Sequence, residues 1–248
     1  RQIGVDVTRH QMQRNGIKII EAAASFLDPH RIELTPCTGG PPSQVTAAKV
    51  AVAVGTTTTR DDNIAFDGKH IFTSDDILEL QTLPKSLTVI GAGVIGIEYA
   101  TIFATLGVRV TVIDKRLRIL PFVDKEIIDT LVHLMRQERV TLRMGEEVSG
   151  IDLIDGDQGQ KVHIALKSGK HINCETVLYS IGRTGATDSL NLDAAGVAAD
   201  PRGRITVNTN YQTEVDHIYA VSDVIGFPSL ASTSMEQGRI AACHAFEM

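Results

Sequence analysis

A run of apolar, mostly β-branched residues leads directly into a glycine-rich turn near the middle of the chain. Residues 87–98 read Leu-Thr-Val-Ile-Gly-Ala-Gly-Val-Ile-Gly-Ile-Glu. In such a pattern Gly91 permits a tight turn, Gly93 lets the backbone approach a pyrophosphate, and Gly96 lets the following helix pack closely on the strand. Amides at the start of that helix attract phosphate groups. The segment therefore predicts a strand, a turn and a helix that bind a dinucleotide.

The residues that follow complete the pattern of a dinucleotide-binding unit. A second β-branched run, Val108–Ile113, ends at Asp114. An acid about 20 residues after the first glycine hydrogen-bonds the ribose hydroxyls in such units, which favours NAD over NADP. Lys115, Arg116 and Arg118 follow at once, and their charges suit the 2′-phosphate of NADP instead. Both coenzymes stay open at this point, as does a glycine turn that has lost its ligand.

Composition excludes several other classes of protein. Of the 248 residues, 43% are hydrophobic and 22% are charged, which is the balance of a globular chain rather than a disordered one. No apolar run reaches the length of a membrane span, and a formal charge of −6 argues against general nucleic-acid binding. The three cysteines are far apart and the histidines lack ligand spacing, so we expect no metal site. Sparse, odd-numbered cysteines favour the reducing cytoplasm.

The order of the predicted elements indicates an α/β fold with a parallel sheet. Before the glycine turn we expect a helix over 8–15, a strand over 17–20, a hairpin over 24–34, a buried strand over 47–54 and a short helix capped by Ser74. After it we expect a helix over 124–136, a strand over 140–142, an antiparallel meander over 147–172 and a buried strand over 176–181. Strands over 204–207 and 217–221 precede a last helix, capped by Ser232 or Thr233, with Met235, Ile240, Ala241 and Phe246 facing inward.

Four segments in this order resemble motifs of the FAD-dependent pyridine nucleotide-disulfide oxidoreductases. They are Ala51–Gly55, similar to the motif that closes the flavin domain; Gly91–Glu98, the nicotinamide-nucleotide fingerprint; the Gly182–Arg183 pair at the NAD cleft; and Thr213–Asp223, the second flavin motif. The resemblance covers essentially the whole chain. It implies a Rossmann-like NAD(P)-binding domain over residues 85–202, flanked by partial FAD-domain segments over 1–84 and 203–248.

The resemblance also implies roles for individual residues. Glu98, placed by the sequence in the first turn of its helix, reaches the nicotinamide amide, and Gly182 and Arg183 line the cleft. Asp223 binds the ribitol chain of FAD, and the helix start at Ala231 directs amides at the flavin ring. No residue of this chain is expected to be catalytic, because the family's redox cysteines and its His-Glu pair belong to other segments.

Within the family, Leu178–Leu190 and Asp223–Ser232 are most similar to the transhydrogenases, which pass hydride between NAD(H) and NADP(H) through FAD. No glycine-rich fingerprint precedes Gly91, so we expect the central fragment of a longer, homodimeric protein. Dihydrolipoyl dehydrogenase and a nucleotide-binding module without turnover are the alternatives. Two positions depart from the family pattern: Ser222 replaces the glycine before the flavin aspartate, and Thr57–Thr59 replaces a Ser-x-Pro corner.

Overall fold

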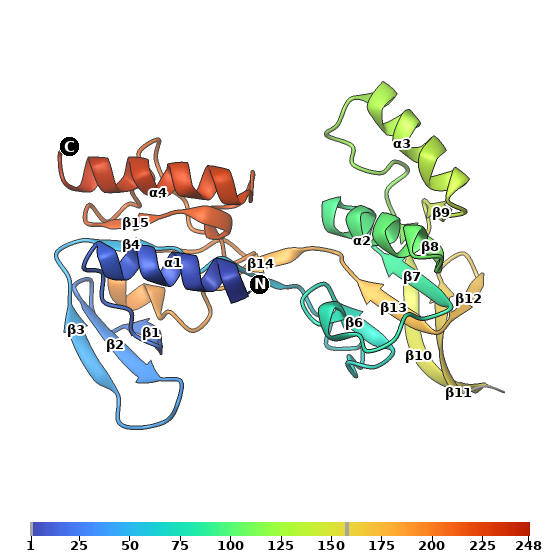
Figure 1. Cartoon of the computed structure of the whole chain (residues 1–248), viewed down its shortest axis with the longest axis horizontal. Coiled ribbons are helices and arrows are strands. Elements are labelled where there is room, and N and C mark those ends of the chain that lie inside the picture. The colour runs from blue at the N-terminus through green and yellow to red at the C-terminus, as the bar shows by residue number, and fades with distance from the viewer. Residues whose placement is uncertain (1, 157–158) are drawn as a thin grey trace. The chain divides into compact units, whose positions relative to one another are not determined.

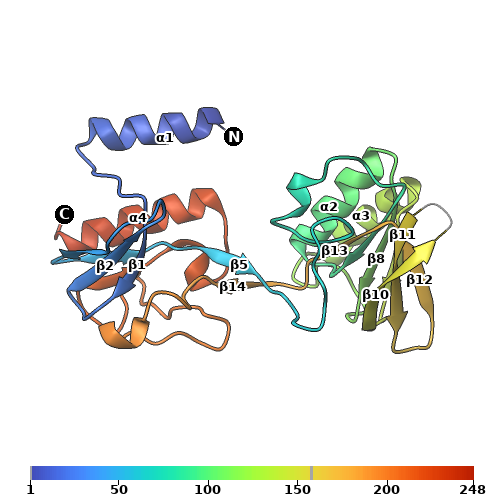
Figure 2. The ribbon, with the colours of Figure 1, turned by 90° about the horizontal axis from the view of Figure 1, so that it is seen from below.

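A computed structural model describes residues 2–156 and 159–248 of the chain (Figure 1). These residues form two compact units, one over Thr57–Thr184 and one that combines the residues up to Thr56 with Gly185–Met248. The chain passes between the units at two strands that hydrogen-bond each other, β5 (Thr56–Thr58) and β14 (Arg183–Gly185), as Figure 2 shows. Among the described helices, none has the length and apolar character needed to cross a bilayer.

The unit over Thr57–Thr184 is built on a five-stranded parallel sheet, ordered β6-β13-β7-β8-β9. Its strands are β6 (Ile71–Thr73), β7 (Ser86–Ile90), β8 (Arg109–Asp114), β9 (Thr141–Met144) and β13 (Thr176–Tyr179). Helices α2 (Val94–Thr105) and α3 (Lys125–Gln137) pack on one face, where Val89, Val112, Ala100 and Met135 are buried together. Strands with apolar side chains on both faces need such covering layers.

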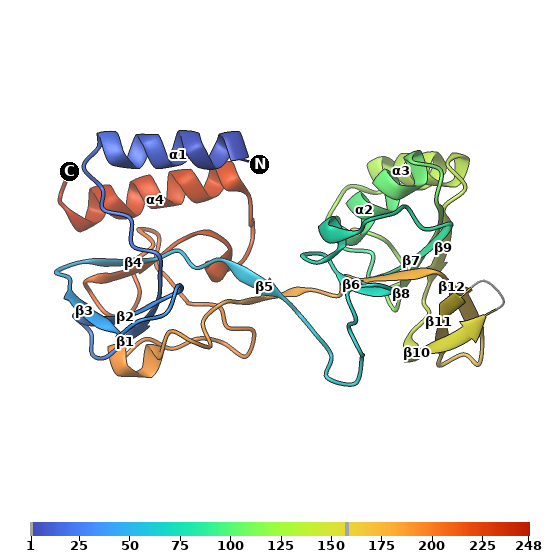
Figure 3. The ribbon, with the colours of Figure 1, turned by 60° about the horizontal axis from the view of Figure 1, so that its bottom comes forward.

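A second sheet covers the opposite face of the parallel sheet (Figure 3). It is the predicted antiparallel meander, formed by β10 (Val148–Gly156), β11 (Gly159–Leu166) and β12 (His171–Cys174). Its inward residues alternate along β11, where Val162, Ile164 and Leu166 are buried against Ile113 and Val177. The α/β class, the parallel sheet and the meander are therefore confirmed.

The other unit contains shorter and fewer paired strands. Its elements are α1 (Gln2–Arg14), the antiparallel strands β1 (Ala22–Phe26), β2 (Arg31–Pro36) and β3 (Ser43–Thr46), the parallel pair β4 (Val50–Val52) and β15 (Ile218–Ala220), and α4 (Ala231–Ala245). Single 3₁₀ turns, η2 (Leu192–Ala195) and η3 (Ser222–Ile225), complete it; a third, η1 (Ile77–Glu79), lies in the unit with the parallel sheet. Phe26, Leu190, Ile205, Ile218 and Val224 form its core.

The unit boundaries differ from the domain boundaries that the sequence suggested. The sequence placed them at 84/85 and 202/203, whereas the compact units divide at 56/57 and 184/185. Strand β6, before the first expected boundary, hydrogen-bonds β13 and so belongs to the parallel sheet. Conversely, Leu190 and Leu192, before the second, pack in the core that contains Phe26.

Several predicted elements are wrong in extent. Residues 17–20 and 204–207 form no strand, although Ile205 makes one isolated bridge to Ala199. The strand expected over 47–54 is reduced to Val50–Val52, which pairs residue for residue with the three residues of β15. The short helix expected after Ser74 is the 3₁₀ turn η1, whose N-cap position is Asp76.

The last helix begins and faces differently from the prediction. Helix α4 starts at Ala231, and its N-cap, Leu230, lies two residues before Ser232 and three before Thr233, the caps that the sequence suggested. Met235 and Phe246 are 73% and 65% exposed rather than inward. Gln237 and Ala241 are the buried residues of this helix. Tyr219 and Val221 pack with Ala241, so the contacted face is set by these neighbours and not by the largest apolar side chains.

Candidate dinucleotide-binding site

The glycine turn lies where the order of the parallel strands reverses. From β7 the chain runs to β8 and then β9 on one side, whereas β13 and β6 lie on the other side of β7. Such a reversal opens a crevice beyond the carboxyl ends of the strands, where α/β proteins bind their ligands. Three segments meet at this edge because they follow neighbouring parallel strands: the glycine turn after β7, Asp114 at the end of β8, and residues 180–183 after β13.

The three glycines of the turn are required for different reasons. Gly91 has a φ of +108°, and a Cβ there would lie 2.4 Å from the carbonyl oxygen of Ser180. A Cβ on Gly96 would lie 1.9 Å from the carbonyl oxygen of Gly91, so α2 packs against the turn as the pattern predicted. Gly93 has no atom within 4 Å of its Cβ position and an ordinary φ of −80°. Neither packing nor backbone conformation within the protein requires this glycine.

The backbone at Gly93 is open to an approaching phosphate group. Gly93 is the N-cap residue of α2 and carries no side-chain acceptor for the first amides of the helix. Those amides and the positive end of the helix dipole favour an anion at this position. A side chain at residue 93 would fill the space that an approaching phosphate needs. The residues present therefore fit the group that the sequence pattern implied.

Glu98 lies one turn further into the helix than expected. Because α2 begins at Val94, Glu98 is its fifth residue and falls outside the first turn, which contains no acid. Its side chain is exposed. The prediction that Glu98 is a first-turn acid is wrong, since the glycine turn continues through Gly93 before the helix starts.

Asp114 is a buried carboxylate at the end of β8, with 8% of its surface exposed. It joins the glycine turn directly, because Oδ2 accepts the amide of Ala92 at 2.6 Å. Arg116 reaches back to the same carboxylate: its backbone amide and Nε donate to Oδ1 at 2.8 and 2.9 Å, and Nη2 donates to Oδ2 at 2.5 Å. Burial opposes ionisation of Asp114, but these hydrogen bonds outweigh it and hold its pKa below the ordinary value.

Asp114 and Arg116, predicted as alternatives for the two coenzymes, thus form one ion pair. The arginine side chain is 43% exposed and the aspartate side chain 6%, so the pair presents its cationic half outward. Lys115 is exposed beside it. A ribose hydroxyl that approaches Asp114 competes with the Arg116 guanidinium, whereas a phosphate that approaches Arg116 competes with Asp114.

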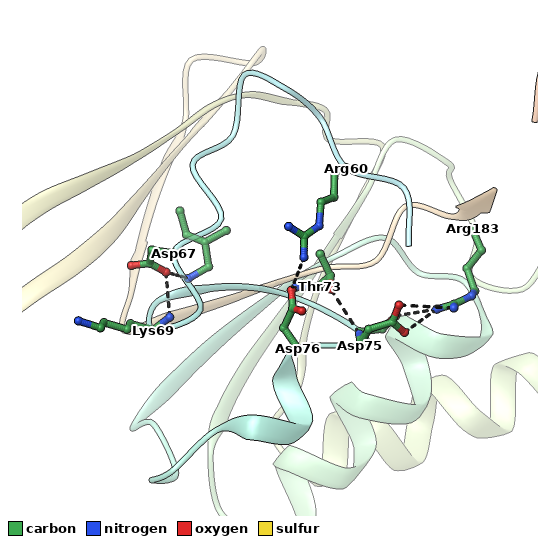
Figure 4. A network of polar contacts seen from close by, with 9 residues as sticks. Arg60, Asp67, Lys69, Thr73, Asp75, Asp76 and Arg183 are labelled. Atoms are coloured by element: carbon green, nitrogen blue, oxygen red, sulfur yellow. Dashed lines mark hydrogen bonds and ion pairs between the residues drawn. The ribbon is translucent and has the colours of Figure 1, made fainter. Parts of the chain in front are cut away.

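On the β13 side of the turn, Arg183 is paired with an acid that sequence analysis did not assign to the site. Nη1 of Arg183 donates to Oδ1 of Asp75 at 2.8 Å (Figure 4). It also donates to Oγ of Ser74 at 3.4 Å. Gly182, which precedes Arg183, has a φ of +150°. Asp75 follows Ser74, where the sequence predicted only a short helix. The three-residue strand β6, which pairs with β13, brings Asp75 to this edge of the sheet.

The residues expected at the flavin, Asp223 and Ala231, belong to the unit that contains Gly185–Met248. Asp223 is half-buried in η3, and Ala231 is the first residue of α4. Ser222 has a φ of +73°, in the left-handed region that favours glycine, so the departure noted at this position falls where the backbone suits glycine. Its amide donates to Oε1 of the buried Gln237 at 2.7 Å.

Metal-ligating clusters and paired cysteines are both absent from the described residues. Within residues 2–156 and 159–248, no cluster of three metal-ligating side chains occurs. The three cysteines are unpaired: Cys37 is exposed, Cys243 is partly buried, and burial raises the pKa of the Cys174 thiol.

Known proteins are similar to this chain in both sequence and fold. A model of the pyridine nucleotide-disulphide oxidoreductase family matches residues 2–238. A soluble pyridine nucleotide transhydrogenase of Mycobacterium tuberculosis is 49% identical over 242 residues, which are 98% of this chain and 51% of that protein. The one from Colwellia psychrerythraea is 44% identical over 229 residues, which are 92% of this chain and 48% of that protein.

Two solved structures superpose on the chain. LpdA from Mycobacterium tuberculosis gives a TM-score of 0.90 at 28% identity, with 98% of this chain and 53% of that one covered. The HOCl-induced flavoprotein disulfide reductase RclA from Escherichia coli gives 0.85 at 25% identity, with 97% and 54% covered. The chain spans about half the length of the curated relatives it matches.

Proposed function

Because this chain belongs to the pyridine nucleotide-disulphide oxidoreductase family, we propose that it is part of a flavoprotein that transfers hydride between NAD(H) and NADP(H) through FAD. The relatives at 43–49% identity that are named soluble pyridine nucleotide transhydrogenases support this activity over others in the family. The whole protein acts in this proposal as a homodimer in the cytoplasm.

The observation that carries the proposal is the empty space at Gly93, at the reversal of strand order. The pyrophosphate of the nicotinamide dinucleotide binds between Gly91 and the start of α2, where Gly96 keeps the helix close to the turn. The unit over Thr57–Thr184 is accordingly the NAD(P)-binding domain. The other unit contributes to the FAD-binding domain.

The two ends of the dinucleotide then meet different residues. On the β8 side, Asp114, Lys115 and Arg116 face the adenosine ribose or its 2′-phosphate. On the β13 side, Gly182 and Arg183 line the nicotinamide end, and Glu98 on α2 approaches the nicotinamide amide. The strand order supports this assignment, since β8 and β13 lie on opposite sides of the glycine turn and an acid in the position of Asp114 binds the adenosine ribose in such folds.

In the flavin-binding part, Asp223 holds the ribitol chain and the amides at Ala231 point to the flavin ring. Bound FAD supplies the chemistry, since it accepts hydride from one nicotinamide coenzyme and returns it to the other. The positive end of α4 stabilises negative charge on a nearby group. The residues of this chain bind and orient; none of them is proposed to form a covalent bond to substrate.

A substitution that fills the space at Gly93 tests the site. Gly93→Val is expected to abolish binding of NAD⁺ to the chain in titration calorimetry, because the side chain blocks approach of the pyrophosphate. Gly150→Val is the matched control: it lies in the same unit, and its nearest neighbour, Oδ2 of Asp152, is 3.9 Å from the added Cβ. Unchanged binding in the Gly93 variant would refute the proposed site.

Activity is tested on the whole flavoprotein by reduction of a thionicotinamide analogue of NAD⁺ with NADPH. Turnover is expected without a disulfide substrate. Reduction of a disulfide such as lipoamide, with no transfer between coenzymes, would instead assign the protein to the disulfide-reducing members of the family.

A further inference from the structure

Asp75 and Arg183 lie on the opposite side of the glycine turn from Asp114. In the sheet, β13 and β6 are on one side of β7 and β8 is on the other. A dinucleotide whose pyrophosphate rests at the turn crosses this reversal, so its two ends lie over strands on opposite sides. With the adenosine at Asp114, the nicotinamide end lies on the side of Arg183. This inference rests on the proposed function.

The Arg183 guanidinium is held before any ligand arrives. Asp75 accepts Nη1 at 2.8 Å and Nη2 at 3.5 Å through its two carboxylate oxygens, and Ser74 accepts Nη1 at 3.4 Å. The side chain of Arg183 is 27% exposed, whereas that of Asp75 is 52% exposed. An arginine fixed by two oxygens in this way loses less conformational freedom on binding than a mobile one.

The segment that carries Asp75 is itself fixed by a chain of hydrogen bonds (Figure 4). The Asp75 amide donates to Oγ1 of Thr73 at 3.3 Å, and that hydroxyl donates to Oδ2 of Asp76 at 2.8 Å. Arg60 donates to the same Asp76 oxygen at 2.9 Å. The backbone position of Asp75 is therefore set by the end of β6.

A further bond ties this segment to the helix that begins at the glycine turn. The hydroxyl of Tyr99 on α2 donates to the carbonyl oxygen of Ser74 at 3.2 Å. The β6 end is thus connected both to Arg183 after β13 and to α2. Glu98, proposed for the nicotinamide amide, is adjacent to Tyr99 in this helix.

We infer that Asp75 is a positioning residue for the nicotinamide half of the coenzyme. It orients the Arg183 guanidinium at the β13 side of the crevice and offsets its positive charge. Arg183 therefore contributes a guanidinium of fixed position and orientation rather than a free positive charge. Asp75 itself does not touch the coenzyme. Its removal therefore affects ligands that contain nicotinamide and spares ligands that lack it.

The test compares NADH with ADP-ribose, which keeps the adenosine and pyrophosphate but lacks nicotinamide. In titrations of the 248-residue chain, Asp75→Asn is expected to raise the dissociation constant of NADH by about two- to fivefold, the range of an exposed ion pair. The constant for ADP-ribose stays unchanged. Asp75→Glu keeps the carboxylate and restores most of the NADH affinity.

Arg183→Gln should reproduce the effect, and the double variant should bind NADH no more weakly than Arg183→Gln alone, because both changes remove the same interaction. Asp62→Asn, which removes one exposed carboxylate from the same unit, is the matched control. Equal weakening of NADH and ADP-ribose would indicate a purely structural role and overturn the inference. Tighter binding of both NADH and ADP-ribose would indicate that Arg183 had become a free cation, and this would also overturn the inference. Unchanged binding of both ligands would overturn it as well.

Failure of the proposed function gives a different result. If the unaltered chain bound neither NADH nor ADP-ribose, the dinucleotide site itself would be refuted, and the role of Asp75 with it. If the unaltered chain bound both ligands and Asp75→Asn changed neither dissociation constant, the dinucleotide site would be retained and only the positioning role of Asp75 would be refuted.

Discussion

At the scale of single residues, the carboxylate of Asp114 is already engaged by its own chain. Its two oxygens accept donors from Ala92 and Arg116, and the resulting low pKa keeps Asp114 ionised at neutral pH. In the proposed site we therefore expect the choice between NAD and NADP to be an exchange of partners within this pair. Loss of Asp114 would leave Arg116 free to bind the 2′-phosphate of NADP. Loss of Arg116 would leave the Asp114 carboxylate free to bind the ribose of NAD and to repel that phosphate.

Asp114→Ala should weaken NAD⁺ more than NADP⁺, because it removes the ribose acceptor and releases Arg116 for the 2′-phosphate. Arg116→Ala should do the reverse. Each lost charged hydrogen bond is expected to cost about 1–3 kcal/mol of binding free energy, measured by calorimetry with both coenzymes. Arg136→Ala, an exposed arginine in the last turn of α3, serves as the control. An unaltered ratio of the two dissociation constants in both pair variants would exclude this strand end as the determinant of coenzyme preference.

At the scale of elements, the short strand β6 depends on the turn that precedes it. Oδ1 of Asp67 accepts the amides of Lys69, His70 and Ile71 at 2.8–3.0 Å, and Oδ2 is 2.8 Å from the ring Nδ1 of His70. Burial opposes ionisation of Asp67, but the hydrogen bonds prevail and lower its pKa far below the ordinary value. This turn directs the chain into Ile71–Thr73, and so to Asp75.

Because the folded pKa of Asp67 is depressed, its contribution to stability is complete above the ordinary aspartate pKa. That contribution disappears as the pH falls from there through the lower, folded value. Asp67→Ala should reduce the free energy of unfolding by about 1–3 kcal/mol at pH 7, from the loss of hydrogen bonds to partly buried amides. Urea unfolding at neutral pH and below about pH 4 should show the difference from wild type shrinking in acid. A difference that stays constant with pH, or an equal loss in the exposed control Asp62→Ala, would contradict this account.

At the scale of the whole molecule, the two units are unequally equipped for their proposed ligands. The unit over Thr57–Thr184 has a complete glycine turn, a five-stranded sheet and covering layers on both faces. In the other unit, β4 and β15 pair only with each other among the described strands, and Ala51 and Val54 near them are exposed. Gly-x-Gly-x-x-Gly occurs once in the sequence, at Gly91.

The chain of 248 residues should therefore bind NAD(H) yet retain little or no FAD. In the proposed assignment, Asp223 and the start of α4 bind only the ribitol and the ring, whereas the pyrophosphate of FAD needs a glycine turn and helix of its own. The visible absorption spectrum of the chain, after incubation with FAD and gel filtration, measures retained flavin. A stoichiometric yellow protein that reduces the thionicotinamide analogue with NADPH would show that the chain is sufficient by itself.

The sequence by itself determined the features whose physical cause is local. The glycine spacing of Gly91, Gly93 and Gly96 specified the turn, since each role depends on backbone within a few residues. Asp124 ahead of an amphipathic run specified the start of α3, and its side chain does accept the amide of Glu126 at 2.9 Å. The alternation in the meander likewise specified which side chains of β11 are buried.

Only the tertiary structure decided which distant segments meet. Strand β6 has three residues, too few to show a periodicity, and it exists through hydrogen bonds to β13 more than 100 residues later. Asp75 joins Arg183 because β6 lies beside β13, and Asp114 accepts the amide of Ala92 because β8 lies beside β7. Met235 of α4 and Phe246 at its C-cap are exposed for the same reason: the buried face of a helix is the one its neighbours contact. Turns, caps and long periodic elements follow from local sequence, whereas short strands and the buried face of a helix depend on the neighbours that the assembled fold supplies.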